Sequence, residues 1–496
     1  GGGQGRAVLG KLNQLVARQV PDFDPTAPVV SESQRGGVAP ALGQAIASAQ
    51  REVQSHVNSA GGASDAGALV RDMQQRNQTL KQAAGTPAER ATIEIVALLF
   101  QSILTEERLP ATVRVWFARL QMPVLRVAVT EPDFFATLDH PARLLIDRMG
   151  SCVMGFAGAS EGGDDDLLHK EVKRIVQTVE AYPDTGRRVF QTVLIEFEKF
   201  LVHYFRDANE ASRKGVSLAQ QLEQREAYAI QYTIELRKML EGVPVHEGVR
   251  EFLFKVWADV IAQSAVQSSP SADDTKALMH LAGDLIWSAS AKTTREERHE
   301  VLQRLPPLLK AIRAGMVRAG MAADKQEQHI KELNAALSAA FSAKSATISA
   351  ERLRDITQRL DALDDVLPEM GDVELDTDTL RDLSGYESDD LEVVGEGGTM
   401  ATPAMMSWAT ELKLGSWLQL DYRGRQEAVQ LAWRGEQKQL VLFVTPNGRG
   451  VLFQIHRLAA FLQAGLLVPV EEESLTVRAT RDALAKLDAD PERLLN

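Results

Sequence analysis

The chain has 496 residues, of which 68 are acidic and 55 basic, so its formal net charge at pH 7 is -13. This balance argues against a protein that binds nucleic acid by neutralising phosphates, and no nucleic-acid partner is expected. The length allows about three domains, and 44% hydrophobic residues are enough for large cores. The longest mostly apolar stretch, Ile95 to Thr105, is shorter than the roughly 20 residues that cross a bilayer, so no membrane span is expected.

The N-terminal region contains neither an initiator Met nor a signal-peptide pattern, so we expect a fragment of a longer protein. Residues 1–66 are predicted to hold a short helix and flexible linkers, because Pro21 to Pro40 mixes prolines with Ser, Gly and Asp. The single cysteine, Cys152, cannot form an internal disulfide, which fits a cytoplasmic location. Its small and apolar neighbours predict a buried structural thiol.

Residues 67–360 are predicted to form one all-helical domain joined by short loops. Thr86-Pro87-Ala88-Glu89 offers an N-cap, a first-turn proline and a capping-box glutamate, and the helix after it is apolar on most sides. Thr294 and Glu297 form a second capping signature. No fixed-period repeat is visible, which disfavours a standard solenoid.

Prolines and tryptophans mark further expected features of this domain. Pro123 predicts a kink or a break, and Pro306-Pro307 predicts an interruption of a long apolar stripe. Trp257 and Trp287 are predicted to be core anchors, because large aromatic side chains on apolar faces dominate the packing of helical cores.

The segment 361–401 is strongly acidic. Between Asp361 and Gly398 there are fourteen acidic residues and one basic residue, so this segment carries the whole net charge of the chain. Such a stretch repels itself and has few large apolar residues, so we predict a disordered linker. Two hypotheses give it a role: it is a charged spacer between domains, or a decoy that occupies a basic surface until a partner displaces it.

Residues 402–496 change from helical to strand periodicity. Asn447-Gly448 lies between two short apolar runs and predicts a hairpin. The predicted strands are Ser416–Leu420, Ala428–Trp433, Leu440–Val444 and Gly450–Ile455, and helices are predicted over about 457–463 and 476–487. The expected fold is therefore mainly α, a multi-helix array with a small C-terminal β-barrel or α+β domain that is large enough to fold alone.

The sequence contains no recognisable catalytic, cofactor or metal motif. The nine histidines have no metal-site spacing, and no phosphate loop, nucleophile elbow or dinucleotide fingerprint is present. We therefore expect no cofactor, no metal and no enzymatic activity, and we predict a protein that binds rather than converts.

Several strings, in order along the chain, resemble the bacterial proteins grouped as domain of unknown function 1631 (DUF1631). The likeness begins near residue 85 and covers most of the chain from there on. No activity is established for that family, so the resemblance implies an architecture and not a reaction. The strings are Leu120–Ala128, Asp133–Phe135, His140–Leu145, Val243-Pro244, Leu285–Ser288, Leu305–Leu309, Leu431–Trp433 and Leu442–Val444.

Two residues of these strings, His140 and Arg143, have two possible roles. They could contact a ligand at the mouth of a groove. Alternatively, they belong to a helix start, in which Pro141 suits the first turn and Arg143 pairs with an acid such as Asp147.

The C-terminal domain resembles a PilZ-type β-barrel, a fold that many bacteria use to sense cyclic di-GMP. That family grips the dinucleotide through arginines of an Arg-x-x-x-Arg motif, which is missing here before the first predicted strand. Four arginines remain candidates for a local anion site, although ordinary solvated strand edges would also explain them: Arg423, Arg425, Arg434 and Arg449.

We therefore predict a non-catalytic cytoplasmic adaptor, a helical scaffold with a PilZ-like module that recognises a protein partner, and a link to cyclic di-GMP signalling stays open. The first alternative is a direct cyclic di-GMP receptor, and the second is an enzyme acting within the helical domain.

Overall fold

The computed structural model describes residues 2–26, 38–59, 65–154, 167–342, 347–367, 383–471 and 473–496. Parts of both predicted linkers, residues 27–37 and 368–382, lie outside these segments. Of the helices in the described segments, none is long and apolar enough to span a membrane.

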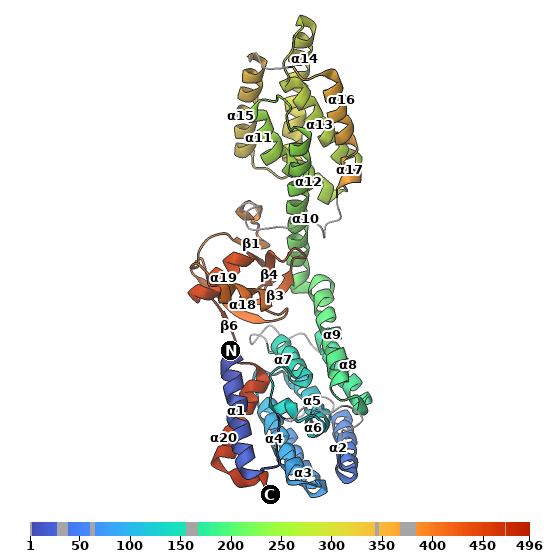
Figure 1. Ribbon diagram of the computed structural model, residues 1–496, viewed down its shortest axis with the longest axis vertical. Helices are drawn as coiled ribbons and strands as arrows, with labels where there is room; N and C mark the ends of the chain where they lie inside the picture. The colour runs from blue at the N-terminus through green and yellow to red at the C-terminus, as the bar shows by residue number, and fades with distance from the viewer. Residues whose placement is uncertain are drawn as a thin grey trace.

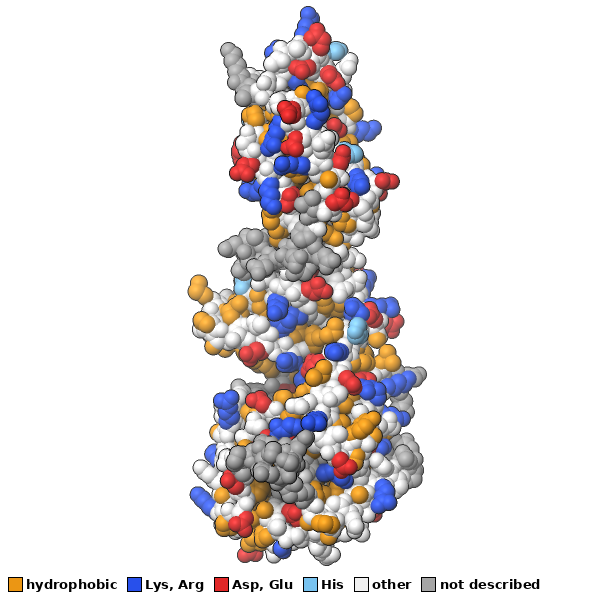
Figure 2. All heavy atoms as spheres, turned by 45° about the vertical axis from the view of Figure 1, so that its right-hand side comes forward, with side chains coloured by type: hydrophobic (Ala, Val, Ile, Leu, Met, Phe, Trp, Pro, Cys, Tyr) orange, Lys and Arg blue, Asp and Glu red, His pale blue; other side chains and the backbone are white. Residues whose placement is uncertain are grey.

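Three parts succeed one another along the long axis of an elongated molecule (Figure 1). We call them the N-terminal lobe (residues 2–208 and 475–496), the sheet domain (383–471) and the distal lobe (240–367). Figure 2 shows acidic and basic side chains interspersed over the distal lobe on the face in view. Among the described residues of that face they do not gather into one basic stripe.

The N-terminal lobe is a bundle of helices closed by the last helix of the chain. Its helices are α1 (Gly2–Gln19), α2 (Pro40–Ser59), α3 (Ala66–Ala83), α4 (Pro87–Leu104), α5 (Ala111–Arg119), α6 (Gln121–Thr130), α7 (Pro141–Val153), α8 (Leu167–Ala181), α9 (Arg187–His203) and α20 (Leu475–Ala489), with short 3-10 turns η1 (Pro132–Phe135), η2 (Pro183–Thr185) and η7 (Pro491–Leu494).

Local signals place the central helix of this lobe. The Thr86 side chain accepts a hydrogen bond from the Glu89 N–H at 3.2 Å, and α4 is buried on most of its sides, both as predicted. The break predicted at Pro123 is also present. It lies at Leu120, three residues earlier, because proline is well tolerated in the first turn of α6.

Helix α20 packs against α1, α4 and α7 rather than against the sheet. Leu475, Ala479, Ala483 and Leu487 recur at a spacing of four and are buried in the core of the N-terminal lobe. The helix was predicted from its periodicity, but the domain in which it packs was not. A fragment of residues 402–496 therefore separates α20 from its core.

Helix α10 (Glu210–Met239) joins all three parts, and the π-helical turn η3 (Tyr204–Ala208) precedes it. Its 30 residues span about 45 Å. Val216 and Leu222 belong to the core of the N-terminal lobe, whereas Tyr232 and Leu236 belong to the distal core. The helical array predicted as one domain over 67–360 thus has two hydrophobic cores.

The distal lobe contains the second of these cores. Thr294 and Glu297 form the predicted capping box at the start of its long helix α14. Its elements are α11 (Glu247–Phe252), the π-helical turn η4 (Leu253–Trp257), α12 (Ala258–Gln267), α13 (Asp273–Ala289), α14 (Arg295–Arg318), α15 (Ala323–Ser342), α16 (Ala350–Asp361) and α17 (Leu363–Val366).

The interruption predicted at Pro306 and Pro307 is wrong, because α14 continues through both residues. A proline has no N–H to donate to the carbonyl four residues earlier, so Pro306 leaves the Leu302 carbonyl free and Pro307 leaves the Gln303 carbonyl free. Leu302 and Gln303 are exposed, so water can hydrogen-bond to the freed carbonyls.

Of the two predicted core anchors, Trp257 is confirmed: it is 1% exposed and donates from Nε1 to the Leu278 carbonyl at 2.9 Å. The prediction for Trp287 is wrong, because this side chain is only half-buried and does not belong to the distal core.

The sheet domain is a curled sheet of six strands in the order β1-β5-β4-β3-β2-β6, with β1 parallel to β5 and the other neighbours antiparallel. Its elements are η6 (Leu383–Tyr386), β1 (Leu391–Val394), α18 (Pro403–Glu411), β2 (Trp417–Tyr422), β3 (Arg425–Arg434), β4 (Leu440–Val444), β5 (Gly450–Gln454), α19 (Ile455–Ala464) and β6 (Leu467–Pro469).

Four of these strands, β2 to β5, match the predicted ones. The hairpin predicted at Asn447-Gly448 connects β4 to β5, and Gly448 adopts the expected positive φ of 88°. Two strands and one helix, β1, β6 and α18, were not predicted. β1 lies within the segment predicted as a disordered linker, where Leu391, Val393 and Val394 are buried.

Both faces of the sheet are covered. Successive side chains of a strand point to opposite faces, and in β4 Leu440 and Leu442 join the core shared with the N-terminal lobe and α10, whereas Val441 and Phe443 pack with α18 and α19. This explains why β4 is an uninterrupted apolar run. The sheet is consequently packed against the N-terminal lobe and α10 on one face and against its own helices on the other.

Candidate functional site

The segment between α18 and β2 contacts helix α7 of the N-terminal lobe through Leu414 and Gly415. The Arg148 guanidinium of α7 donates to the Leu414 carbonyl and to the Glu198 carboxylate of α9, each at 2.9 Å. Gly415 has a φ of 84°, and a Cβ at this position would overlap the Cys152 Sγ. Cys152 is buried as predicted, and burial raises the pKa of its thiol, the opposite of what a nucleophile needs.

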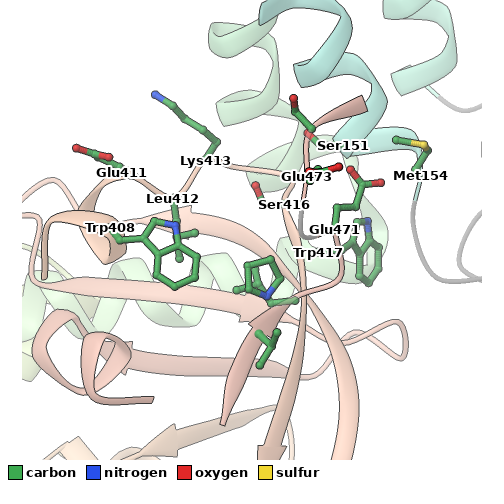
Figure 3. Close-up of a pocket in the computed structure, with 14 residues that line it drawn as sticks. Ser151, Met154, Trp408, Glu411, Leu412, Lys413, Ser416, Trp417, Glu471 and Glu473 are labelled. Atoms are coloured by element: carbon green, nitrogen blue, oxygen red, sulfur yellow. The ribbon is translucent and has the colours of Figure 1, made fainter. Parts of the chain in front are cut away.

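A cavity of about 570 Å³ lies beside this junction (Figure 3). Its wall comes from α18, β2, β6, the end of α7 and the segment that leads into α20. Figure 3 shows the indole rings of Trp408 and Trp417 on two sides of the cavity and Glu471 beside Trp417. We call it the tryptophan pocket, and its lining residues are Ser151, Met154, Trp408, Glu411, Leu412, Lys413, Ser416, Trp417, Leu418, Val468, Pro469, Glu471, Glu473 and Ser474.

The charged side chains that line the tryptophan pocket are Glu411, Glu471, Glu473 and one base, Lys413, and Glu473 is paired with Arg481 outside the lining. Burial raises the pKa of Glu471, although the Arg108 guanidinium lies 3.4 Å from its carboxylate and opposes this. Aromatic faces and carboxylates both attract cations. The pocket therefore has the chemistry to hold a cationic side chain.

A second cavity, of about 600 Å³, lies on the other side of the segment Glu411–Lys413. Arg434 lines it and donates to the carbonyls of Ala409 at 3.2 Å and Leu412 at 2.9 Å, at the C-terminal end of α18. Burial lowers the pKa of the Arg434 guanidinium. This predicted anion-site arginine thus lies at the far end of β3 from the other three.

Glu223 of α10 also lines the second cavity, and it is only 4% exposed. It accepts a hydrogen bond from the Glu436 N–H at 3.0 Å, while its Oε2 has no hydrogen-bond partner among the described residues. Burial raises the pKa of Glu223 to about 7. The carboxylate therefore fixes the β3–β4 turn to α10 at the cost of carrying a buried charge above neutral pH.

Glu223 makes a testable contribution to the pH dependence of stability. In the folded protein the Glu223 carboxyl stays protonated up to a pH of about 7, whereas in the unfolded chain it ionises near its ordinary pKa of 4.5. The free energy of unfolding therefore falls as pH rises between these two values. We expect Glu223→Gln to remove about 2 kcal/mol of this fall. Urea unfolding at several pH values measures it, with the exposed Glu241→Gln as control. An unchanged pH profile in Glu223→Gln would contradict the assignment.

The other three predicted arginines converge on one buried carboxylate, Glu392 of β1. The Arg425 Nη2 lies 2.8 Å from Glu392 Oε1, the Arg449 Nη1 3.3 Å from Oε2, and the Arg423 Nη1 3.4 Å from Oε1. Arg423 also pairs with Glu387 at 3.0 Å, and Arg449 pairs with Glu427. We call Arg423, Arg425 and Arg449 the arginine triad; in this structure the chain's own acids neutralise it.

His140 and Arg143 lie inside the N-terminal lobe rather than at the mouth of a cavity. His140 is the N-cap of α7, accepts from the Ala142 N–H at 3.2 Å and lies 3.5 Å from the Glu131 carboxylate. Arg143 is fully buried and donates to the Phe134 carbonyl and to Thr480 of α20. Burial lowers the pKa of the Arg143 guanidinium to about 10. Both residues join α7 to its neighbours.

The residues that sequence reasoning missed are the ones that come together from distant segments. Trp408 lies in a segment that was assigned no structure, and Trp417 lies in a predicted strand; this aromatic pair was the available signal. Glu471 lies more than fifty residues further on, and nothing in its surroundings marks it. The described residues contain no group of three or more side chains that could hold a metal ion.

Three family models match the chain. They are described as the second domain of the protein of unknown function DUF1631, over residues 38–186, its third domain, over 218–334, and its C-terminal tudor domain, over 404–470. Together they match about two thirds of the chain, and they correspond to the N-terminal lobe, to α10 with the distal lobe, and to the sheet domain. No curated protein and no solved structure gives a significant match.

Proposed function

The chain belongs to the DUF1631 family, and we propose that it is a non-catalytic cytosolic adaptor whose sheet domain binds a basic segment of a protein partner. The tryptophan pocket carries this proposal. Two indole rings and three carboxylates line it against a single lysine, and cation–π contacts with desolvated aromatic rings stabilise Lys, Arg or quaternary ammonium groups by roughly 1 to 2 kcal/mol.

Two further features support an adaptor. The sheet domain is packed on both faces and fixed through Arg148 and Gly415, so the pocket is preformed, and preformed sites lose little entropy on binding. The model that matches residues 404–470 is described as a tudor domain and not as a PilZ domain. The PilZ-like resemblance therefore stays a prediction, and the proposal does not depend on it.

A peptide array tests the ligand class. The 496-residue chain is applied to peptides that carry Lys, Arg or trimethyl-Lys at one position and to matched peptides with Gln or Glu there. We expect the cationic peptides to bind and Trp408→Ala to weaken them about tenfold. Affinity should rise with pH, because a bound cation favours the ionised form of Glu471, whose pKa is raised. Preferential binding of the Glu peptides would contradict the proposal.

A cyclic di-GMP receptor is the second candidate, because the three arginines of the triad meet at one point. Guanidinium groups match phosphates and guanine edges well, but the dinucleotide would have to displace Glu392. Calorimetric titration of the full chain with cyclic di-GMP tests this, and no heat at micromolar protein would remove it. An enzyme in the helical lobes stays an untested alternative.

A further inference from the structure

Strand β1 occupies one edge of the sheet and does not come from a hairpin. It precedes β2 in the chain but pairs in parallel with β5, from Leu391 opposite Gly450 to Val394 opposite Phe453. Without β1, the backbone groups of β5 on this side would have no strand partner. The edge of β5 is thus a strand acceptor that the chain fills from within.

The groove along this edge has sockets of defined chemistry. Leu391 and Val393 are buried on the side of the sheet that faces α10, and Val394 is buried on the other side, against α19 and its neighbours. A Cβ on Gly450 would lie 3.1 Å from the Leu391 Cδ1, so the glycine leaves the space that this leucine fills. The groove accepts an apolar residue on either side of one acidic position.

Three arginines form ion pairs with the acidic residue of β1, Glu392. Glu392 is 5% exposed, and all three guanidinium groups of the triad lie within 3.4 Å of its carboxylate. A carboxylate that is buried loses its hydration, and this costs free energy unless cationic partners replace the water. The three guanidinium groups are those partners. The triad therefore selects an acid at this point of the strand.

Contacts upstream extend the same groove. The Tyr386 hydroxyl donates to Glu226 at 3.1 Å, and the Arg225 guanidinium lies 4.9 Å from the centre of its ring. Lys214 pairs with Asp390 at 2.7 Å. Backbone pairing, alternating sockets and a charge contact are the features by which sheet edges bind extended peptides.

We propose that the β5 edge, with its arginine triad, is a docking groove for an extended segment of another protein with the pattern apolar-acidic-apolar-apolar, and that β1 occupies it until that segment displaces it. A small phosphate ligand would use the triad alone and leave the apolar sockets empty. The backbone pairing and the sockets therefore favour a protein segment. This inference uses a different surface from the tryptophan pocket and stands independently of it.

The test uses the full chain and a fluorescein-labelled peptide with the sequence of residues 383–394. Because the built-in strand competes at a high effective concentration, wild type should bind the peptide weakly. The double variant Leu391→Asn with Val393→Asn weakens β1 and leaves the groove intact, and we expect it to bind the peptide about tenfold more tightly or better. Glu392→Gln is a second opening variant that spares the apolar core.

Charge reversal identifies the groove. In the double variant, a peptide with Glu392→Arg should bind about tenfold more weakly than the original peptide. Adding Arg425→Glu to the protein should restore the binding of the Glu392→Arg peptide and weaken the binding of the original one. Arg318→Glu, on α14, is the control and should change neither affinity. Equal binding of both peptides to a folded opened variant, or no binding at all, overturns the proposal. A concentration-dependent dimer of wild type by strand exchange also overturns it, because the occupant would then be a second copy.

Discussion

Replacing Gly415 with alanine is expected to lower the free energy of unfolding by about 3 kcal/mol, because two costs add at this position. The backbone φ of 84° is unfavourable for any residue with a Cβ, and the new methyl group would overlap the buried Cys152 Sγ. Chemical denaturation of the full chain measures the change. The loss would loosen the contact between the sheet domain and α7.

Two variants separate these costs. Gly242→Ala has a similar φ of 71° with no atom within 4 Å of the new Cβ, so it reports the backbone cost alone, about 1 kcal/mol. Cys152→Ala removes the sulfur, and we expect Gly415→Ala to be at least about 1 kcal/mol less costly in that background. If the two substitutions were additive, the packing of Gly415 on Cys152 would be wrong.

Replacing Trp257 with alanine is expected to destabilise the distal lobe by about 3 to 5 kcal/mol. The indole is 1% exposed, donates from Nε1 to the Leu278 carbonyl and packs against Gly315, where a Cβ would lie 2.7 Å from its ring. Because the distal core is separate from the core of the N-terminal lobe, hydrogen exchange should quicken in α11 to α16 and stay unchanged in α4 and α20.

Trp287→Ala is the matched control for this experiment. Trp287 is in the same lobe but only half-buried, with Lys292 4.0 Å from the centre of its ring, so its replacement should cost clearly less than that of Trp257. Faster exchange throughout the chain in Trp257→Ala would mean that the two helical cores unfold as one unit and would contradict the division at α10.

Local signals predicted the elements whose formation is decided locally. The N-cap at Thr86, the capping box at Thr294 and the Asn447-Gly448 hairpin depend on neighbours within a few residues, and each is present. The capping box predicted at Thr86 forms only in part, because the Glu89 carboxylate accepts from the Gly85 N–H. Pro306 was misjudged because its effect depends on whether the freed carbonyl faces solvent, which is decided by packing. Strand β1 was missed because it lies in the acidic segment, whereas its partner β5 is an apolar strand about sixty residues further along the chain.

The same distinction applies to the candidate sites. Four arginines, Arg423, Arg425, Arg434 and Arg449, were candidates for a local anion site. The structure brings three of them together at Glu392, whereas Arg434 bonds to the end of α18. Their compensation by Glu392 depends on a strand inside the acidic segment, where net charge suggested solvation. The tryptophan pocket combines α18, β2 and the segment before α20, so no single stretch of sequence contains it.

Binding of a cationic peptide in the tryptophan pocket is the central claim, and one calorimetric titration tests it most directly. The peptide that binds best on the array is titrated into the full chain and into the Trp417→Ala and Trp287→Ala variants. We predict an affinity about tenfold lower for Trp417→Ala and an unchanged affinity for Trp287→Ala. An unchanged affinity for Trp417→Ala, or an equal loss in both variants, would contradict the claim.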